Sequence, residues 1–419
     1  MPVTERLRLP TANLVLPATF AALKHRNFRL WFFGQMISQM GTWMKQVAQG
    51  WLVYEITGSM LALGTISFLG SMPTLFLMIP AGAIGDRLPK RYVLMATQTT
   101  MMICAFTLAW LSGTHRVQVW HVGMVAFVVG IANSFDAPTR HSMVVELVED
   151  RRDVMNAVAL NSTLFNLARI VGPAIAGFLL AYVGAAPCFL INGFTFLAVL
   201  LALWFIRPPE NVQAVAREPL LTQVRTGLHY VRHNQAIRVL LLLSSISGLF
   251  GFMYPTLMPA LAADVLHVGE EGLGTLNAAV GVGALSASLI MASLGGFRRK
   301  GLLVTVGSLL FPCTLILFSA SRSYPLSAAL LAVVGFALVT QNATINTLMQ
   351  SLAPDDLRTR VMALFALSFF GTHPFSALLS GALAEAFGPA TAVGIGAAIS
   401  LVFAVGLLLR APSLRNLEA

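Results

Sequence analysis

The stretch APCFLINGFTFLAVLLALWFI, residues 186–206, contains 21 consecutive residues without a charged side chain. Arg207-Pro208-Pro209-Glu210 follows it directly. A helical crossing of the hydrocarbon core of a bilayer, which is about 30 Å thick, takes about 20 apolar residues. The stretch is therefore predicted to cross a membrane once as a helix, and the charged and proline-rich residues after it are predicted to end the crossing.

Long apolar runs of this kind recur along the whole chain. The chain is 57% hydrophobic and 11% charged, with a mean hydropathy of +0.77, whereas soluble domains carry about 25% charged residues. Each run is predicted to be a helix, because backbone polar groups in lipid must bond within their own segment. We therefore predict an all-α membrane protein with twelve transmembrane helices. The predicted spans are 28–54, 60–84, 92–112, 119–148, 155–183, 186–206, 236–263, 271–294, 302–321, 325–350, 360–386 and 390–409.

Lys and Arg are distributed unequally between the two sides of the predicted membrane. If both termini and the loops after even-numbered spans share one side, that side holds 23 of the 27 Lys and Arg, and the other side holds only Arg116 and Arg322. Cytoplasmic loops carry the excess of Lys and Arg. We therefore predict a cytoplasmic N-terminal segment, 1–27, and a cytoplasmic tail, 410–419. Because the positive charges lie in loops, the net charge of +10 does not predict nucleic-acid binding.

The longest polar break, residues 207–235, divides the spans six and six. It predicts a cytoplasmic linker between two bundles, 28–206 and 236–409. A weak repeat supports this division: EDRRDVMNAVALNSTLFNLARIVGPAIAGFLLAYVG, which starts at Glu149, resembles PDDLRTRVMALFALSFFGTHPFSALLSGALAEAFG, which starts at Pro354. Repeated halves are typical of transporters that bind substrate between two pseudo-symmetric bundles.

The loop between the second and third spans carries the most specific motif, Gly82-Ala-Ile-Gly85-Asp86-Arg87-Leu88-Pro89-Lys90-Arg91. This sequence resembles the loop 2–3 signature of the major facilitator superfamily. The resemblance extends over nearly the whole chain. It includes residues 34–64 (GQMISQMGTWMKQVAQGWLVYEITGSMLALG), 130–148 (GIANSFDAPTRHSMVVELV) and 156–177 (NAVALNSTLFNLARIVGPAIAG), which are similar to the bacterial branch that contains the enterobactin exporter and drug-efflux proteins.

The resemblance implies a gate at the cytoplasmic face. In the superfamily the loop Asp and Arg, here Asp86 and Arg87, lock the outward-facing state. The acids Glu146 and Glu149 are the expected partners of Arg87 and of the two further cations of the loop, Lys90 and Arg91. The second half has GGFRRKG at 295–301, which keeps the cations and lacks the acid, so a symmetric second lock is not expected.

Three ionisable residues are candidates for coupling transport to protons. Arg169 lies within the fifth span, where an unpaired charge costs roughly 2.5–3.5 kcal/mol on insertion scales. Asp136, near Pro138 of the fourth span, is predicted to lie at a comparable depth, so we hypothesise an Asp136–Arg169 pair. The pair either changes partners during transport or is a permanent structural pair. His373 is a weaker candidate, because a histidine can titrate near neutrality.

The first span predicts part of a substrate cavity. At 100° per residue its polar residues form one stripe, and such stripes usually face a bundle interior. Lys45 lies beside the stripe and either meets an anionic substrate or extends toward the outer interface. Gly172, Pro173 and Gly177 resemble the antiporter motif and predict a bend in the fifth span. The predicted cavity residues are Gln35, Gln39, Thr42, Lys45, Gln46, Asn133, Asn166 and Asn342.

The resemblance implies a secondary transporter in the cytoplasmic, or inner, membrane of a bacterium. We expect proton-coupled export of a small amphipathic molecule, either drug-like or siderophore-like, by a monomer without a cofactor and with the proton gradient as energy source. An uptake symporter or a lysophospholipid transporter is the alternative, and a non-transporting receptor is a further one. No catalytic cluster, GxxxxGK[ST] loop or metal-ligand spacing is present, so the sequence predicts neither an enzyme nor a metal site.

Overall fold

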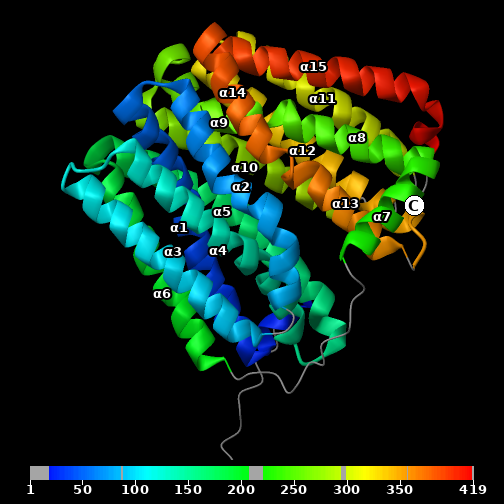
Figure 1. Cartoon of the computed structure of the whole chain (residues 1–419), viewed down its shortest axis with the longest axis horizontal. Coiled ribbons are helices and arrows are strands. Elements are labelled where there is room, and N and C mark those ends of the chain that lie inside the picture. Colours follow the sequence, from blue (N-terminus) through cyan, green and yellow to red (C-terminus); the bar gives the residue numbers. More distant parts are fainter. Residues whose placement is uncertain (1–17, 86–87, 207–219, 294–298, 356, 418–419) are drawn as a thin grey trace, which may run out of the picture.

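The computed structural model describes residues 18–85, 88–206, 220–293, 299–355 and 357–417. All the regular secondary structure in these residues is helical. Figure 1 shows the helices in two groups, one built from the N-terminal half of the chain and one from the C-terminal half. The predicted all-α fold with two helical bundles is confirmed.

The N-terminal half contains six long helices that coincide with the first six predicted spans to within a few residues. A short 3-10 helix, η1, precedes them at Ala18–Lys24, and another, η2, precedes α5 at Arg151–Asp153. The six helices are α1 (Arg26–Thr57), α2 (Met60–Gly85), α3 (Lys90–Gly113), α4 (Val119–Glu146), α5 (Val154–Val183) and α6 (Ala185–Phe205).

The C-terminal half contains the other six spans, and two of them are interrupted. The uninterrupted spans are α10 (Gly269–Ser293), α11 (Lys300–Ala320), α12 (Tyr324–Leu352) and α15 (Pro389–Arg410). The seventh span consists of α8 (Gln235–Leu249), the 3-10 turn η3 (Gly251–Met253), α9 (Tyr254–Ala260) and the π-turn η4 (Leu261–Val265). The eleventh consists of α13 (Arg358–Phe370) and α14 (His373–Phe387).

The prediction of one continuous helix is therefore wrong for the seventh and eleventh spans. Phe252 leaves helical geometry, with φ −91° and ψ 24°. Pro255 and Pro374 each lie in the first turn of the helix that follows a break. Proline lacks a backbone N–H donor and starts a helix more easily than it continues one. Both breaks thus have a cause that is visible in the residues around them.

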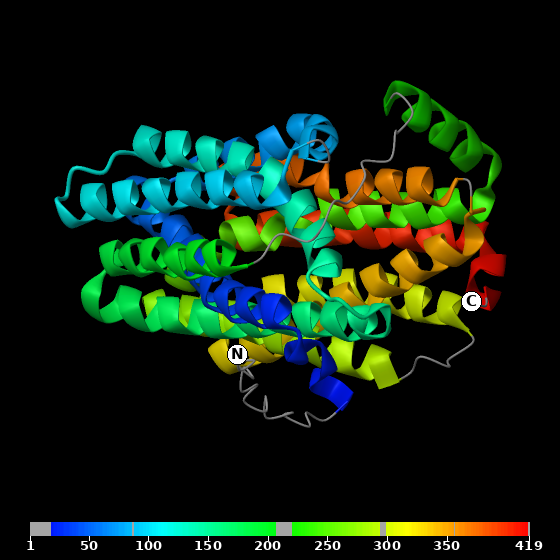
Figure 2. The same cartoon turned by 90° about the horizontal axis from the view of Figure 1, so that it is seen from below.

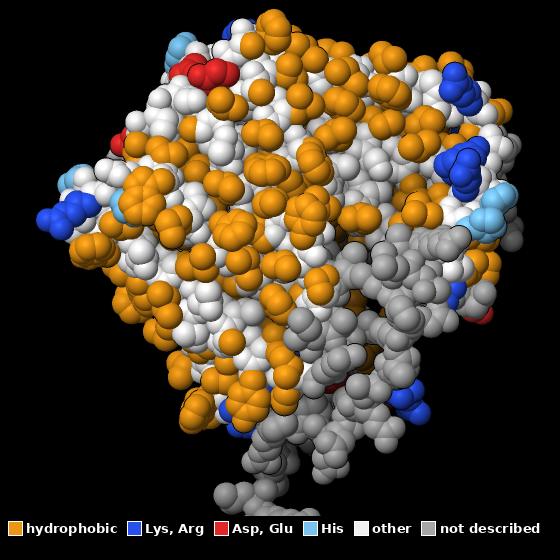
Figure 3. Space-filling model, in the orientation of Figure 1, with side chains coloured by type: hydrophobic (Ala, Val, Ile, Leu, Met, Phe, Trp, Pro, Cys, Tyr) orange, Lys and Arg blue, Asp and Glu red, His pale blue; other side chains and the backbone are white. Residues whose placement is uncertain are grey.

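Eleven helical stretches of the described chain are long and apolar enough to cross a membrane. The twelfth transmembrane helix is α1, which is 32 residues long and more polar because of its glutamines, Lys45 and Glu55. Large hydrophobic side chains are widely exposed on the bundle surface. Figure 3 shows one such face, where hydrophobic side chains cover the middle and Lys and Arg lie toward the edges. This surface matches a lipid environment.

A helix that the sequence did not indicate, α7 (Leu220–His233), lies inside the predicted linker. It packs against α13, where Gly227 approaches Leu364 and Arg360. Figure 2 shows α7 at the same end of the molecule as the C-terminus. We call this end the basic end, because the termini of the other helices there carry Lys90, Arg91 and Lys300 among others. The boundaries 207–235 stay a prediction, and residues 207–219 lie outside the described residues.

Two crossings of small residues join the halves near the opposite end. A Cβ atom added to Gly64 of α2 would lie 2.9 Å from Cα of Gly381 in α14. One added to Gly177 of α5 would lie 2.8 Å from Cα of Gly274 in α10. Gly177 and Gly381 are 204 positions apart in the chain. The predicted repeat is therefore confirmed as two equivalent helix crossings between the halves.

We call the opposite end the acidic end, because Asp264, Glu270, Glu271 and Glu385 lie there. The two equivalent helices α5 and α14 both end near the acidic end. Gly184 and Gly388, again 204 positions apart, end α5 and α14 with positive φ angles of 79° and 84°. Glycine adopts this conformation without the strain that a Cβ atom brings.

Candidate functional site

A cavity of about 1110 Å³ lies between the two halves. Its wall combines residues of all six N-terminal helices, α1 to α6, with residues of the seventh span, α10, α12, α13 and α14. Transporters with repeated halves bind substrate at such an interface, near the middle of the membrane. The cavity is therefore the candidate substrate site.

The N-terminal wall contains four of the eight predicted cavity residues. Thr42, Lys45 and Gln46 of α1 line the cavity, together with Asn133 of α4. Lys45 thus lies in the cavity wall, and the alternative that it extends toward the outer interface is wrong. Asn342 of α12 lines the cavity from the other half.

Three predicted cavity residues lie elsewhere. Gln35 and Gln39 are buried, and they lie about two turns and one turn, respectively, closer to the basic end than Thr42, where the lining part of α1 begins. Asn166 donates a hydrogen bond from Nδ2 to the carbonyl oxygen of Ser162 at 3.0 Å and does not line the cavity. None of these three residues lines the cavity in this structure. Gln35 and Gln39 fall outside it because the polar stripe of α1 continues beyond the depth of the cavity, and the Asn166 amide instead bonds within α5.

An aromatic and basic cluster lies on the N-terminal wall. Trp43 of α1 and Phe165 of α5 meet edge to face, with ring centroids 5.6 Å apart and an angle of 71°. The Cζ atom of Arg169 lies 5.6 Å from the centroid of the Trp43 ring. This distance allows a cation–π interaction. We call these three residues the Arg169 cluster.

A second cluster lies on the C-terminal wall, where the two interrupted spans meet. His373, the first residue of α14, stacks on Phe252 with centroids 4.4 Å apart and an angle of 10°. Phe252 also meets Phe369 edge to face, with centroids 5.7 Å apart and an angle of 75°. We call these three residues the His373 cluster. Its aromatic members, and those of the Arg169 cluster, were not predicted from the sequence.

The cavity wall carries basic side chains and, among the described residues, no carboxylate. Lys45, Arg169 and His373 line it, and no Asp or Glu of the described chain does. Within the described part of the chain, neither Lys45 nor Arg169 has an ion pair or a hydrogen bond. The guanidinium of Arg169 contacts the ring of Trp43. The cavity thus presents two cations without protein counter-charges.

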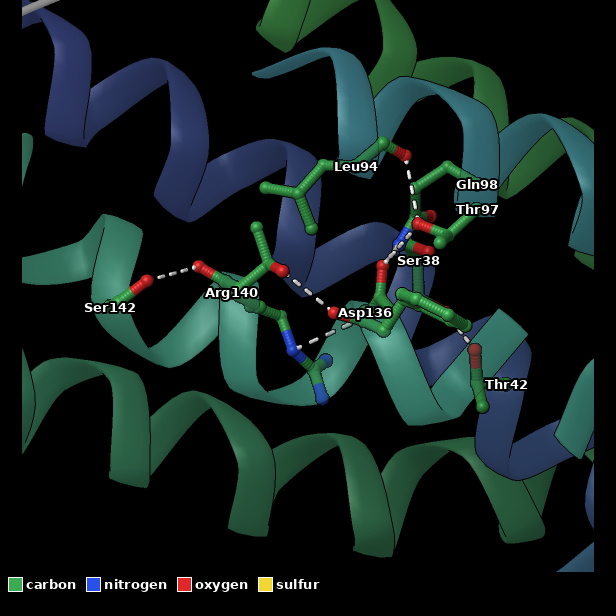
Figure 4. A network of polar contacts seen from close by, with 10 residues as sticks. Ser38, Thr42, Leu94, Thr97, Gln98, Asp136, Arg140 and Ser142 are labelled. Atoms are coloured by element: carbon green, nitrogen blue, oxygen red, sulfur yellow. Dashed lines mark hydrogen bonds and ion pairs between the residues drawn. The ribbon is translucent and has the colours of Figure 1, made fainter. Parts of the chain in front are cut away.

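The predicted Asp136–Arg169 pair is not formed. Figure 4 shows Asp136 of α4 turned toward α3, where Oδ1 accepts hydrogen bonds from Thr97 Oγ1 and Gln98 Nε2, both at 2.9 Å. Its Oδ2 lies 3.7 Å from Nε of Arg140, one turn further along the same helix. Asp136 is buried and does not line the cavity. Similar depth did not bring Asp136 and Arg169 together, because their side chains leave their helices in different directions.

Part of the predicted gate is visible at the basic end. Lys90 Nζ donates to a carboxylate oxygen of Glu146, which joins α3 to α4. Arg91 donates instead to the backbone oxygen of Trp204 at 3.0 Å, and Glu149 is exposed. Asp86 and Arg87 lie outside the described residues, so their role in a gate stays a prediction.

Contacts between the halves gather at the acidic end. The Tyr54 hydroxyl of α1 donates to Oδ1 of Asp264, in the seventh span, at 2.5 Å. Glu385 Oε2 of α14 accepts from the hydroxyl of Ser59 at 3.1 Å and from the backbone N–H of Leu61 at 3.0 Å. A carboxylate at the start of a helix pairs with free N–H donors and with the helix dipole. The start of α2 is thereby held by a residue of the other half.

The predicted antiporter motif provides close packing. A Cβ atom added to Gly172 would lie 2.6 Å from the backbone oxygen of Met40, so this glycine lets α5 approach α1. Gly177 makes the crossing with α10 described above. Pro173 lies inside α5, which runs as one helix from Val154 to Val183. The predicted bend at these three residues stays a prediction.

Comparisons with known proteins agree with this architecture. Residues 17–419 match the family model described as transmembrane secretion effector. The multidrug efflux pump Tap of Mycolicibacterium fortuitum is 28% identical over 92% of this chain and 96% of the relative. The staphyloferrin A transporter of Staphylococcus aureus is 24% identical, over 86% and 90%. Macrolide efflux protein A of Streptococcus pyogenes is 20% identical, over 87% and 92%.

Solved structures share the fold. A POT family transporter in complex with 5-aminolevulinic acid has a TM-score of 0.76 at 13% identity, and the match covers 93% of this chain and 96% of that chain. A bacterial homolog of the human lysosomal transporter Spinster, in an inward-facing and unoccupied conformation, has a TM-score of 0.69 at 13% identity, over 95% and 96%. The chain belongs to the transmembrane secretion effector family of the major facilitator superfamily.

Proposed function

We propose that this member of the transmembrane secretion effector family exports small amphipathic molecules from the cytoplasm by alternating access. The protein is a multi-pass membrane transporter of small molecules. Export is proposed because two of its relatives are named efflux proteins, for multiple drugs and for macrolides. The proposed location is the cytoplasmic membrane of a bacterium, with the basic end and both termini in the cytoplasm and with the protein working as a monomer.

The observation that carries this proposal is the cavity shared by two halves that are fastened together at one end. At the acidic end Tyr54 contacts Asp264, and Glu385 contacts the start of α2. The described ion pairs at the basic end, such as Lys90 with Glu146 and Arg358 with Asp355, each stay within one half. Such an arrangement supports a cavity that opens toward the basic end in this state and toward the other side after the halves rock.

Transport tests the proposal directly. A proton gradient is established across inverted membrane vesicles, in which the cytoplasmic face is outside. A labelled macrolide or labelled staphyloferrin A is then added to the outside. We expect accumulation of at least one compound that stops when the gradient is collapsed. Accumulation only in vesicles of native orientation would instead support uptake. Binding without flux in either orientation would support a receptor.

We further propose that export is coupled to the proton gradient and that Asp136 is the residue that couples them. A buried carboxylate that accepts two hydrogen bonds and lies near Arg140 has partners that change when it binds a proton. We expect Asp136→Asn to leave substrate binding within about twofold and to abolish gradient-driven accumulation. Thr97→Val, which removes one donor and keeps the charge, is the matched control and retains most of the flux. Full gradient-driven transport by Asp136→Asn would assign Asp136 a purely structural role.

A further inference from the structure

The Arg169 and His373 clusters occupy equivalent places in the two halves. Phe369 follows Phe165 by 204 positions, and His373 follows Arg169 by the same number. This is also the offset of Gly177 and Gly381, which make the equivalent crossings between the halves. The remaining members, Trp43 and Phe252, come from the first and seventh spans, each of which is the first span of its half. Each half therefore contributes an edge-to-face aromatic pair with a basic side chain packed on one ring.

The two clusters also lie at the same depth. Arg169 lies 14 residues before the end of α5 at Val183, and His373 lies 14 residues before the end of α14 at Phe387. At 1.5 Å per residue both are about 21 Å from the acidic ends of their helices. The clusters consequently face a shared cavity near the middle of the membrane, which is where transporters of this architecture hold their substrates.

The charge balance of the cavity selects among substrates. A cation in the middle of a membrane normally has a partner or a wet cavity, because its burial costs several kcal/mol. Lys45 and Arg169 have no carboxylate partner within the described chain. An anionic group of a substrate would supply the missing partner of either cation, whereas a cationic substrate would meet repulsion and no acid on the wall.

We propose that the cavity binds amphipathic anions that carry a planar aromatic group. The anionic group binds Arg169, Lys45 is a second cation on the same cavity wall, and the aromatic group stacks on the His373 cluster. Arg169 is the residue suited to the anion, because its planar guanidinium offers several donors while it remains over the Trp43 ring. The proposal rests on the proposed transport function and adds the substrate class to it.

Three pyrene probes of similar size separate charge from shape: 1-pyreneacetate, 1-pyrenemethanol and 1-pyrenemethylammonium. Binding to the purified full chain in phosphatidylcholine nanodiscs is measured by pyrene fluorescence, and binding to empty nanodiscs is subtracted. A hydrogen bond to a charged group contributes enough for roughly a 10-fold change or more in affinity. We expect 1-pyreneacetate to bind at least about 10-fold more tightly than the neutral alcohol, and the ammonium probe to bind most weakly.

Variants locate the preference. Arg169→Gln is expected to reduce the affinity for 1-pyreneacetate to within about twofold of that for 1-pyrenemethanol, while the affinity for the alcohol stays unchanged. Arg116→Gln, which removes a charge from the loop between α3 and α4, is the matched control and keeps the preference. Lys45→Gln is the second test if Arg169→Gln does not fold. His373→Ala is expected to weaken all three probes alike, by roughly 2- to 10-fold, through lost stacking.

The inference is overturned if the neutral or cationic probe binds as tightly as 1-pyreneacetate, or if folded Arg169→Gln and Lys45→Gln variants both keep the preference for the anion. Flux is a separate readout. Transport of all three probes without a charge preference in binding would reject this substrate class and leave the transporter intact. Charge-selective binding that depends on Arg169, without flux of any compound in either vesicle orientation, would reject the proposed function and leave the binding site.

Discussion

The two ends of the molecule differ in what holds the halves together. At the acidic end, α2 crosses α14 at Gly64 and Gly381, and side chains of one half bond to the other half. At the basic end, the described ion pairs such as Lys90 with Glu146 fasten helices of the same half to each other. The acidic end is therefore built as a closure between the halves, whereas the described residues of the basic end form two separate rims.

The glycine crossings are the strongest part of this closure. Replacing Gly177 by Leu puts a side chain where Cα of Gly274 is only 2.8 Å from the ideal Cβ position, so the helices must separate. We expect the acidic end to open and the labelling rate of a cysteine in the cavity, Gln46→Cys in a variant without Cys104, Cys188 and Cys313, to rise more than about 10-fold for a membrane-impermeant thiol reagent added from that side.

Gly406→Leu is the control for this prediction, because a Cβ atom at Gly406 of α15 meets no other atom within 4 Å. It is expected to leave the labelling rate unchanged. Unchanged labelling in Gly177→Leu, with a correctly folded protein, would show that the crossing does not close the cavity.

The hydrogen bond between Tyr54 and Asp264 is expected to matter less. Asp264→Asn keeps the size of the side chain and removes the charge that the Tyr54 hydroxyl pairs with. A loss of ~1 kcal/mol from the closed acidic end corresponds to about a fivefold rise in the open population. The same cysteine labelling measures this rise. Tyr54→Phe removes the same bond from the other side and should give a similar value, and a double variant should add little beyond either one.

Glu385 makes a similar contribution through the start of α2. Glu385→Gln retains an acceptor for the N–H of Leu61 and loses the charge that favours the N-terminus of a helix. We expect a shift of about 0.3–1 kcal/mol toward the open acidic end, or roughly two- to fivefold in labelling rate. Glu271→Gln, which removes a charge at the same end from α10, should have no such effect.

The pair of Lys90 and Glu146 should have the smallest influence on this state. It joins α3 to α4 within one half, so breaking it with Lys90→Gln leaves the contacts between the halves intact. Partly exposed ion pairs contribute about 0–1 kcal/mol. We expect thermal stability to fall slightly and cavity labelling from the acidic side to stay within about twofold. A large rise in labelling would mean that the basic end also controls the closure at the acidic end.

The sequence predicts the spans well because lipid imposes a strong requirement on length and apolarity. The interrupted helices around Phe252 and His373 escaped prediction, because an apolar composition does not distinguish a continuous helix from a broken one. The sequence did contain a signal: glycine and proline follow each other closely at Gly251 and Pro255, and at Gly371 and Pro374.

The residues of the cavity wall were only partly predictable from the sequence of α1. The polar stripe of α1 correctly places Thr42 and Gln46 on the wall, because its period gives the direction of the side chains. It does not give the depth at which the halves part, so Gln35 and Gln39 were included wrongly. The predicted pair of Asp136 and Arg169 is wrong for the opposite reason: the prediction used the depth of the two residues and not the direction of their side chains. The cation near Asp136 is Arg140, one turn away on the same helix.

Distances measured at both ends in the same protein show whether the two halves rock against each other. Spin labels at Arg116→Cys and Arg322→Cys report on the acidic end, and labels at Arg152→Cys and Asp355→Cys report on the basic end, each pair joining the two halves. When Gly177→Leu is introduced, rocking of the halves predicts that the first distance lengthens and the second shortens. A lengthening of the first distance while the second stays the same or also lengthens would contradict alternating access.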